Sequence, residues 1–527
     1  MEENKISKKD SKEEKRKIST KCKDFWTKHF RNLSSVRQIL LWYLIISLTG
    51  ALLLWLPISQ QNEAFNDNPI KFIDALFLSS SAFSDTGLST ITLSEQLNFF
   101  GQLITLILLS IGGIGWFTMK IFILTWILKR KTSYNSFAVG ASEVGTTNKK
   151  ETLGLIFSAI IISFFCSLIF GFIFSFIFYG TGVLAIDGET LNYGKSLWAG
   201  LFHAAASINN SGLDIFAGND SLATLYGDEV AIKVGAEVSI QILTMILFII
   251  GGIGFGVFYD VYKWGKNIKT GEKFTFSLIT KLSVSVYIAV ALIGLFLVYL
   301  SEGIAVLGNN NAFLSKDFHD PIANNAMGYE NTNVAFRWWE LTFNTFSTRN
   351  AGFSTMNLSL LQVPTLLIHS TMMFIGSGPG STAGGLRTTT FGVLFVSIWA
   401  MLRNNPKATV FNKAISEERI KKAIVILFAS IFLTFSWIIV ISIIEEASFS
   451  NAINSPKFMD NFFVIFSAFG TTGLSTFDLS NYHWLSKLLI IILMFIGQMG
   501  MSTTLSQIKP KSTFFKRQYV EEYVNLG

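Results

Sequence analysis

The sequence predicts an all-α membrane protein with eight full spans and four re-entrant half-helices, arranged with pseudo-fourfold symmetry about one axis. Three observations predict this fold. Half of the 527 residues are hydrophobic and 15% are charged, whereas a soluble domain carries charges at roughly a quarter of its positions. Uncharged runs of about 20 residues, long enough to cross a bilayer, recur along the chain. One short phrase, centred on a glycine, appears four times between such runs.

The predicted spans fall in pairs, and each pair encloses one copy of the phrase. They are residues 36–57 and 99–128 in unit one (36–130), 151–179 and 234–262 in unit two (151–265), 276–300 and 361–402 in unit three (275–403), and 420–444 and 484–505 in unit four (418–508). The second span of unit three is broken in its middle by glycines and a proline. Residues 1–35 and 509–527 are polar tails.

Basic residues predict the orientation. Residues 129–150, 263–281 and 403–422 are rich in lysine and arginine, as are both tails, whereas the intervening segments are polar or acidic. Because cytoplasmic segments carry the excess of lysine and arginine, we expect both termini in the cytoplasm and the four phrases entering from outside a cell membrane. The net charge of +7 follows from this topology, and no nucleic-acid partner is expected.

The four phrases read SAFSDTGLST (81–90), SINNSGLDI (207–215), FSTRNAGFST (346–355) and FSAFGTTGLST (466–476). A short amphipathic stretch leads into each one, at residues 72–83, 196–206, 336–345 and 458–469. Such stretches span only about half of the hydrocarbon core at 1.5 Å per residue. A half-helix that enters from outside points its partly negative C-terminal end at the central axis, which favours a cation there.

Glycine turns allow consecutive backbone carbonyl oxygens to face one side, and neutral oxygens suit a hard monovalent cation. One such glycine is common in any loop or turn, but four at matching places predict a cation-conducting pore with a carbonyl-lined selectivity filter. The residues expected in the filter are Asp85, Thr86 and Gly87; Asn210, Ser211 and Gly212; Asn350, Ala351 and Gly352; and Thr471, Thr472 and Gly473.

Charged residues lie beside three of these turns. Arg349 would repel a cation if it faced the pore, so we expect it behind the filter, paired with a carboxylate or carbonyl group. Asp85 and Asp214 either make the outer mouth attractive to cations or serve as helix caps or solvated turn residues, and the sequence does not choose between these roles.

The break in unit three predicts an intramembrane gating loop. Its glycine-rich run lacks the Gly-Lys-Ser/Thr ending of a nucleotide-binding loop, and apolar runs on both sides place it near the middle of the bilayer, below the filter. Arg387 would anchor the loop or add a positive barrier; the alternative is a kinked helix that packs through small residues. The loop residues are Gly376, Ser377, Gly378, Pro379, Gly380, Ser381, Thr382, Ala383, Gly384, Gly385 and Arg387.

Other small or polar residues in the spans have simpler interpretations. Gly112–Gly113 and Gly251–Gly252 are expected to begin the second spans of units one and two as close-packing positions, and Gly497 and Gly500 to do so in unit four. Gln498, a polar residue within that span, is a candidate pore-lining residue. The five histidines are scattered without metal-ligand or catalytic spacing, so neither an enzyme nor a cofactor held by this chain is expected.

These glycine-centred loops, the Gly-Gly motifs of the second spans and the PGSTAGGLRTTT break resemble the Trk/Ktr/HKT superfamily of potassium transporters, most closely the Ktr-type membrane subunit. The resemblance covers about residues 36–527 and implies a pore formed by one chain, usually in a homodimer. It implies potassium uptake, since all four filter positions are glycine, and a cytosolic regulatory ring that binds nucleotide. The chain departs from the family in one motif: Gln498 stands where an arginine is common.

Two alternatives to this function remain. A sodium-coupled or less selective monovalent cation transporter would suit the loss of a positive charge at Gln498. A membrane-embedded enzyme or a scaffold belongs to a different class; the enzyme would need catalytic or metal-ligand pairs within the spans, and the scaffold would have no need of four glycine-centred loops.

Overall fold

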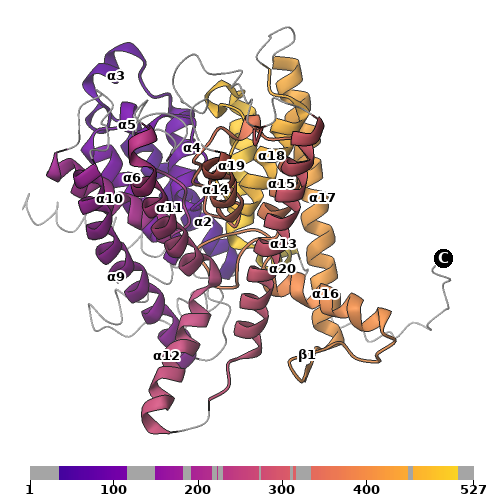
Figure 1. Cartoon of the computed structure of the whole chain (residues 1–527). Coiled ribbons are helices and arrows are strands. Elements are labelled where there is room, and N and C mark those ends of the chain that lie inside the picture. Colours follow the sequence, from indigo (N-terminus) through magenta and orange to yellow (C-terminus); the bar gives the residue numbers. More distant parts are fainter. Residues whose placement is uncertain are drawn as a thin grey trace, which may run out of the picture.

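The computed structural model describes residues 35–115, 149–181, 192–216, 222, 230–271, 274–308, 313–315, 334–448 and 455–508. The two tails, most of the basic segment at 129–150 and the end of the predicted span at 99–128 lie outside these residues. Helices dominate the described part, with a single short hairpin (Figure 1). The helices of units one and two are α2 (Ser35–Trp55), α3 (Asn62–Asp67), α4 (Phe72–Phe83), α5 (Leu93–Gln96), α6 (Phe99–Ile114), α9 (Lys149–Thr181), α10 (Tyr193–Ile208), α11 (Val230–Ile253) and α12 (Phe255–Thr270).

The second half of the chain follows the same order of a long helix, a short helix and a further helix. Its elements are α13 (Leu278–Gly308), α14 (Val334–Ser347), α15 (Val363–Phe374), α16 (Thr388–Leu402), the hairpin β1 (Thr409–Val410) and β2 (Lys413–Ala414), α17 (Glu417–Ser448), α18 (Phe458–Gly470), α19 (Trp484–Met499) and α20 (Met501–Ile508).

Four helices among the described residues are long and apolar enough to cross a bilayer: α2, α9, α13 and α17. Each is the first span of a predicted unit. Only 22–33% of their most apolar windows is buried in the protein, and residues such as Phe296 and Phe432 are largely exposed. An apolar surface of this kind is stable only against lipid tails, so the chain is a membrane protein whose first spans face the bilayer.

The second spans differ from the prediction, because the helix breaks at a left-handed glycine in three units. Gly115 follows α6 with φ 89°, Gly254 follows α11 with φ 100°, and Gly500 follows α19 with φ 81°. The turn at Gly254 bends α11 from α12 by 91°, so the continuous helix expected over 234–262 is wrong. The helix expected over 484–505 is likewise divided at Gly500. Only the break in unit three was predicted.

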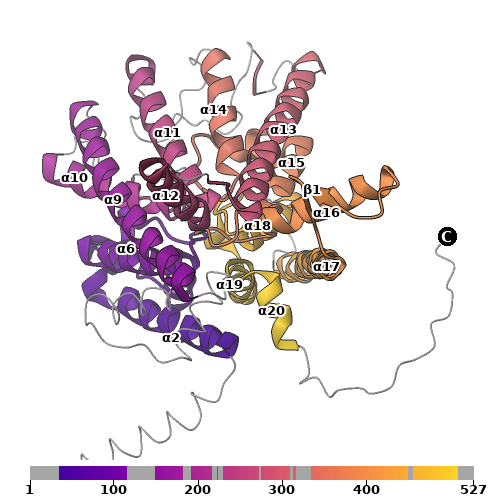
Figure 2. The ribbon, with the colours of Figure 1, turned by 90° about the horizontal axis from the view of Figure 1, so that it is seen from below.

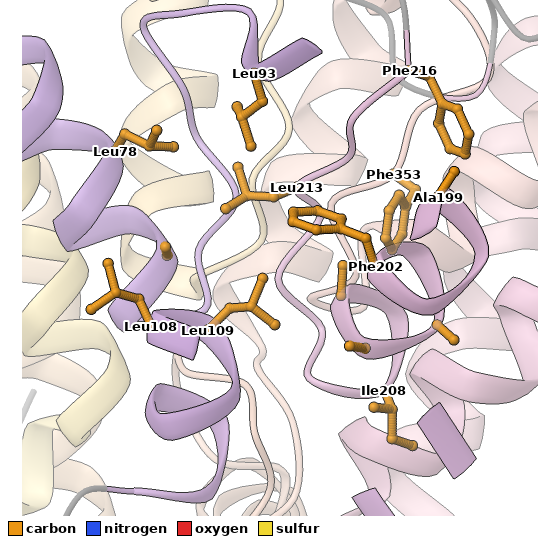
Figure 3. Packing of buried hydrophobic residues seen from close by; sticks show 14 of the residues in the cluster. Leu78, Leu93, Leu108, Leu109, Ala199, Phe202, Ile208, Leu213, Phe216 and Phe353 are labelled. Carbon is orange, nitrogen blue, oxygen red and sulfur yellow. The ribbon is translucent and has the colours of Figure 1, made fainter. Parts of the chain in front are cut away.

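Seen from below, the elements follow one another around the centre in the order of the sequence, from α2 through α9, α11 and α13 to α17 and α19 (Figure 2). The short helices α4, α10, α14 and α18 match the four predicted half-helices in their place along the chain. Their inner surfaces are almost fully buried. Figure 3 shows one apolar cluster that joins Leu108 of α6, Phe202 of α10 and Phe353 of the third loop. This cluster therefore joins residues of units one, two and three.

A buried ion pair joins the first and last units. Lys487 of α19 places its Nζ 2.7 Å from Asp74 Oδ1 of α4, and the Nζ also donates to the Ser480 carbonyl oxygen. Both side chains are nearly buried, so their attraction is weakly screened. Neither residue was singled out in the sequence, where more than 400 positions separate them.

Candidate functional site: a ring of four loops

The four predicted loops share one backbone conformation. Two residues before each central glycine, a non-glycine residue has a left-handed φ: Asp85 (46°), Asn210 (55°), Asn350 (69°) and Thr471 (50°). The glycines then have φ values of 91°, 63°, 80° and 97°. L-residues rarely adopt this conformation without local support. Its recurrence in four loops of different sequence shows that the units impose one geometry on the chain here.

These loops close into a ring. A Cβ atom on each glycine would lie within 3.0 Å of a carbonyl oxygen in the next loop: Gly87 against Ser211, Gly212 against Ala351, Gly352 against Thr472, and Gly473 against Thr86. The last contact returns to the first loop. Real Cβ atoms do not come so close to an oxygen, so glycine is needed at every corner of the ring.

Hydrogen bonds to the preceding helix fix the residue before each glycine. The N–H groups of Thr86, Ser211 and Thr472 donate to Ser81, Ala206 and Ser467 at 2.8–2.9 Å. In the third loop the Ala351 N–H donates to the Ser347 carbonyl at 2.8 Å. In a trans peptide the carbonyl points opposite to the N–H, so these bonds turn the carbonyls of the preceding residues, Asp85, Asn210, Asn350 and Thr471, away from the half-helices. The carbonyls of the bonded residues themselves approach the glycines of the neighbouring loop.

A cavity of about 630 Å³ lies on the outer side of the ring. All four central glycines line it, together with Asp74, Asp214 and Asp478. Asp214 Oδ1 accepts from the Phe216 N–H at 3.1 Å, so this carboxylate is a turn residue at the rim of the cavity. Asp85 is different: its side chain is fully buried and does not line the cavity. The roles of outer-mouth charge and solvated turn residue are therefore wrong for Asp85.

Arg349 lies behind the ring, as predicted. Its guanidinium donates to the carbonyls of Met372 (2.8 Å), Ile375 and Gly376 (2.9 Å), and it stacks over the Tyr287 ring at 4.8 Å. Met372 and Ile375 belong to the C-terminal end of α15, where helix carbonyls lack intrahelical partners. The arginine thus satisfies the helix end that the break in unit three creates.

The loop from Gly376 to Thr390 is packed against two other units and the ring. Gly378 donates to Gly252 at 3.0 Å, while the Phe255 N–H donates to Gly380 at 3.0 Å. The Gly384 N–H donates to Thr471 Oγ1 of the fourth ring loop at 2.7 Å. Every residue from Gly376 to Gly378 and from Thr382 to Leu386 is buried. The break is therefore an ordered loop at the inner side of the ring.

Arg387 and Gln498 join this loop to α19. The Arg387 guanidinium donates to the loop carbonyl of Ala383 and, at 3.2 Å, to the backbone carbonyl of Gln498. Gln498 Nε2 donates in turn to the Thr382 carbonyl at 3.0 Å. These contacts support the anchoring role that the sequence left open for Arg387. A cavity of about 90 Å³ borders both side chains on the inner side.

Glycines near the ends of the second spans allow close approach to the ring, but their position was mispredicted. Gly112, Gly251 and Gly497 lie in the last turns of α6, α11 and α19, whereas they were expected to begin these spans. A Cβ on any of them would meet the carbonyl of Phe83, Ile208 or Phe469 at the end of a half-helix. The close-packing role is confirmed. The missed signal for the helix break was the glycine three residues later in each span: Gly115, Gly254 and Gly500.

The described residues contain no group of three or more His, Cys, Asp or Glu side chains that would hold a metal ion. His203 of the short helix α10 is buried, and its Nε2 is hydrogen-bonded to Thr244 Oγ1 at 2.8 Å. It is a packed histidine.

Comparisons with known proteins agree with this geometry. A family model described as TrkH, cation transport protein, matches residues 43–517. The chain is 31% identical to the "Uncharacterized cation transporter MG322" of Mycoplasma genitalium over 93% of its own length and 97% of that protein. It is 29% identical to the "Ktr system potassium uptake protein B" of Bacillus subtilis, over 87% and 89% of the two chains.

The crystal structure of the potassium transporter TrkH from Vibrio parahaemolyticus has the same fold. It superposes with a TM-score of 0.57 at 16% identity, and the match covers 92% of this chain and 86% of that one. The chain is therefore no enzyme: it belongs to the TrkH family of cation transport proteins, in which it fits the Ktr-type membrane subunits.

Proposed function

We propose that this chain conducts potassium into the cell through the ring of four loops, driven by the membrane potential. Each inward charge gains about 2.3 kcal/mol per 100 mV. The observation that carries the proposal is the closed ring, in which each glycine packs against a carbonyl of the next loop. The names of the Bacillus and Vibrio proteins refer to potassium and support the choice of ion.

The filter consists of backbone oxygens from the twelve residues named above. A dehydrated cation needs several oxygens at once, and four loops around one axis supply them from all sides. The N–H groups of Thr86, Ser211, Ala351 and Thr472 support this assignment, because their bonds turn the preceding carbonyls, those of Asp85, Asn210, Asn350 and Thr471, away from the half-helices. The side chains at equivalent positions differ, as expected if the main chain does the coordination.

Eight spans and four half-helices, divided into units at 36–130, 151–265, 275–403 and 418–508, suit this pore. The bent and broken second helices each count as one span in this topology. Both tails, 1–35 and 509–527, lie in the cytoplasm. Support comes from the lower end of the molecule in Figure 1, where α12 and the hairpin gather Lys263, Lys266, Lys269 and Lys413, as cytoplasmic segments do.

The loop from Gly376 to Thr390 acts as the gate. Its hydrogen bonds to Gly252, Thr471 and α19 hold it at the inner side of the ring, so its displacement would open the path below the filter. A cytosolic ring that binds nucleotide controls the gate, and two copies of the chain form a homodimer. The resemblance to Ktr subunits supports both partners. Nucleotide belongs to the separate ring, and this chain carries only the transported potassium ion.

A less selective or sodium-coupled transporter is the second candidate. Gln498 favours it, because an uncharged side chain replaces the arginine common in the family and removes a positive barrier beneath the filter.

Uptake of potassium and sodium by the purified protein in liposomes, at a set membrane potential, tests the proposal. We expect potassium flux to exceed sodium flux, and Gly352→Ser to reduce this preference at least about tenfold, because its side chain would displace a filter carbonyl. Gly256→Ser is the matched control, since a Cβ on this helical glycine meets no atom within 4 Å. Gly112→Ser is unsuitable, because its side chain would press on the Phe83 carbonyl beside the filter.

Equal loss of selectivity in Gly352→Ser and Gly256→Ser would remove the filter assignment. Comparable potassium and sodium flux in the wild-type protein would favour the second candidate. If the wild-type protein is silent, the cytosolic ring is added; silence in its presence would contradict the transport proposal itself.

A further inference from the structure

Asp85 is the one charged residue among the four that precede the ring glycines by two positions; the others are Asn210, Asn350 and Thr471. Its side chain is fully buried. Within the described part of the chain, neither carboxylate oxygen has a hydrogen-bond partner. A buried carboxylate is costly unless it is paired or coordinates a metal, so its environment has to supply a compensating group.

The neighbouring amide of Asn209 does not supply that group. Asn209 Nδ2 donates to the Ala205 carbonyl at 2.9 Å, which fixes the orientation of the amide and turns its oxygen the other way. This Oδ1 is also buried, and no donor reaches it from the residues with a described position. The two arginines near the ring, buried Arg349 and half-buried Arg387, are engaged elsewhere: Arg349 with carbonyls of unit three, and Arg387 with the gating loop and Gln498.

The two free oxygens face the same space. A Cβ atom on Gly113 of α6 would lie within 2.8 Å of both Asp85 Oδ2 and Asn209 Oδ1. Its nearest neighbours come only from these two side chains. Gly113, which has no side chain, thus lets an anionic oxygen and a neutral oxygen approach the same stretch of backbone. Two acceptors with no donor between them repel each other, and a cation between them would turn this repulsion into attraction.

We propose that Asp85 and Asn209 hold a monovalent cation at a site between units one and two, beside the filter. The ligands are side-chain oxygens, which suit a hard cation, and one negative charge balances one positive charge. The site rests on the proposed pore, which supplies the cation, but it is distinct from the ring of backbone carbonyls. Sodium and potassium are both candidate occupants, and binding measurements distinguish them.

The test is equilibrium binding of radioactive sodium and rubidium, the latter in place of potassium, to the purified full-length protein in an otherwise cation-free organic buffer. We expect two classes of bound cation in the wild-type protein. Asp85→Asn should lower the affinity of one class at least about tenfold, since a buried cation loses its charged ligand. Gly113→Ala keeps the charge but presses its Cβ against both oxygens and should weaken the same class. Gly256→Ala, at a position with no neighbour within 4 Å, should weaken neither.

Gly352→Ser separates this site from the filter. If it removes one class and leaves the Asp85-dependent class, both proposals are supported. If it removes neither class while Asp85→Asn removes one, the filter assignment fails and the side site stands. If it removes both, the filter ion itself compensates Asp85, and the separate site is overturned. If Asp85→Asn binds both cations as the wild type does but binds one proton fewer, the separate site is overturned, and Asp85 is a protonated carboxyl group.

Discussion

Replacement of Arg349 tests whether the break in unit three depends on a buried cation. The guanidinium is fully buried and satisfies three carbonyls: those of Met372, Ile375 and Gly376. Arg349→Met keeps much of the side-chain length but leaves these carbonyls unpaired. A buried acceptor that is left without its donor costs about 1–3 kcal/mol. We expect the free energy of unfolding to fall by that amount, and Arg349→Lys to lose about half as much, because an ammonium cannot match the fork of a guanidinium.

Unfolding in mixed detergent micelles, titrated with a denaturing detergent and followed by tryptophan fluorescence, measures this loss. Arg403→Met is the matched control: Arg403 is exposed and only stacks on Trp399 at 4.7 Å, an interaction of about 0.5–1 kcal/mol. If Arg349→Met destabilised the protein no more than Arg403→Met, the end of α15 would have other partners and the reasoning would be refuted.

Three further predictions concern polar contacts that hold helices and loops together. Lys487→Met leaves Asp74 buried and unpaired and should destabilise the protein by about 3–5 kcal/mol. The double variant with Asp74→Asn should recover at least half of that loss. If the two single losses simply add in a double-mutant cycle, the coupling is contradicted. Gln498→Ala removes the 3.0 Å hydrogen bond to Thr382, worth about 1 kcal/mol, so partner-independent potassium flux in liposomes should rise up to about fivefold; lower flux would speak against the gate. Glu302 accepts from the Gln362 N–H and from Thr365 Oγ1 at the start of α15. Glu302→Ala should therefore lower the free energy of unfolding by about 1–3 kcal/mol in the same assay, and Glu302→Gln clearly less. Equal losses would mean that the acceptor oxygen is not what matters.

The sequence by itself determined the class of protein and the location of the ring. Long apolar runs with few charges have one stable environment, the bilayer, so the amino-acid composition alone predicts a membrane protein. The glycines of the ring were visible because a positive φ together with a close approach of the next loop, repeated four times, leaves four glycines at matching places. Even the position of Arg349 behind the ring followed from simple electrostatics.

Only the tertiary structure decided which groups meet across units. The ion pair of Lys487 with Asp74 and the approach of Asp85 to Asn209 join residues whose separation along the chain gives no periodic signal. The breaks at Gly115, Gly254 and Gly500 were missed for a related reason: a glycine is tolerated within an apolar helix, and the sequence around it does not mark it as a turn. Local chemistry fixes what each segment prefers, whereas partners for buried charges depend on how the four units close around their axis.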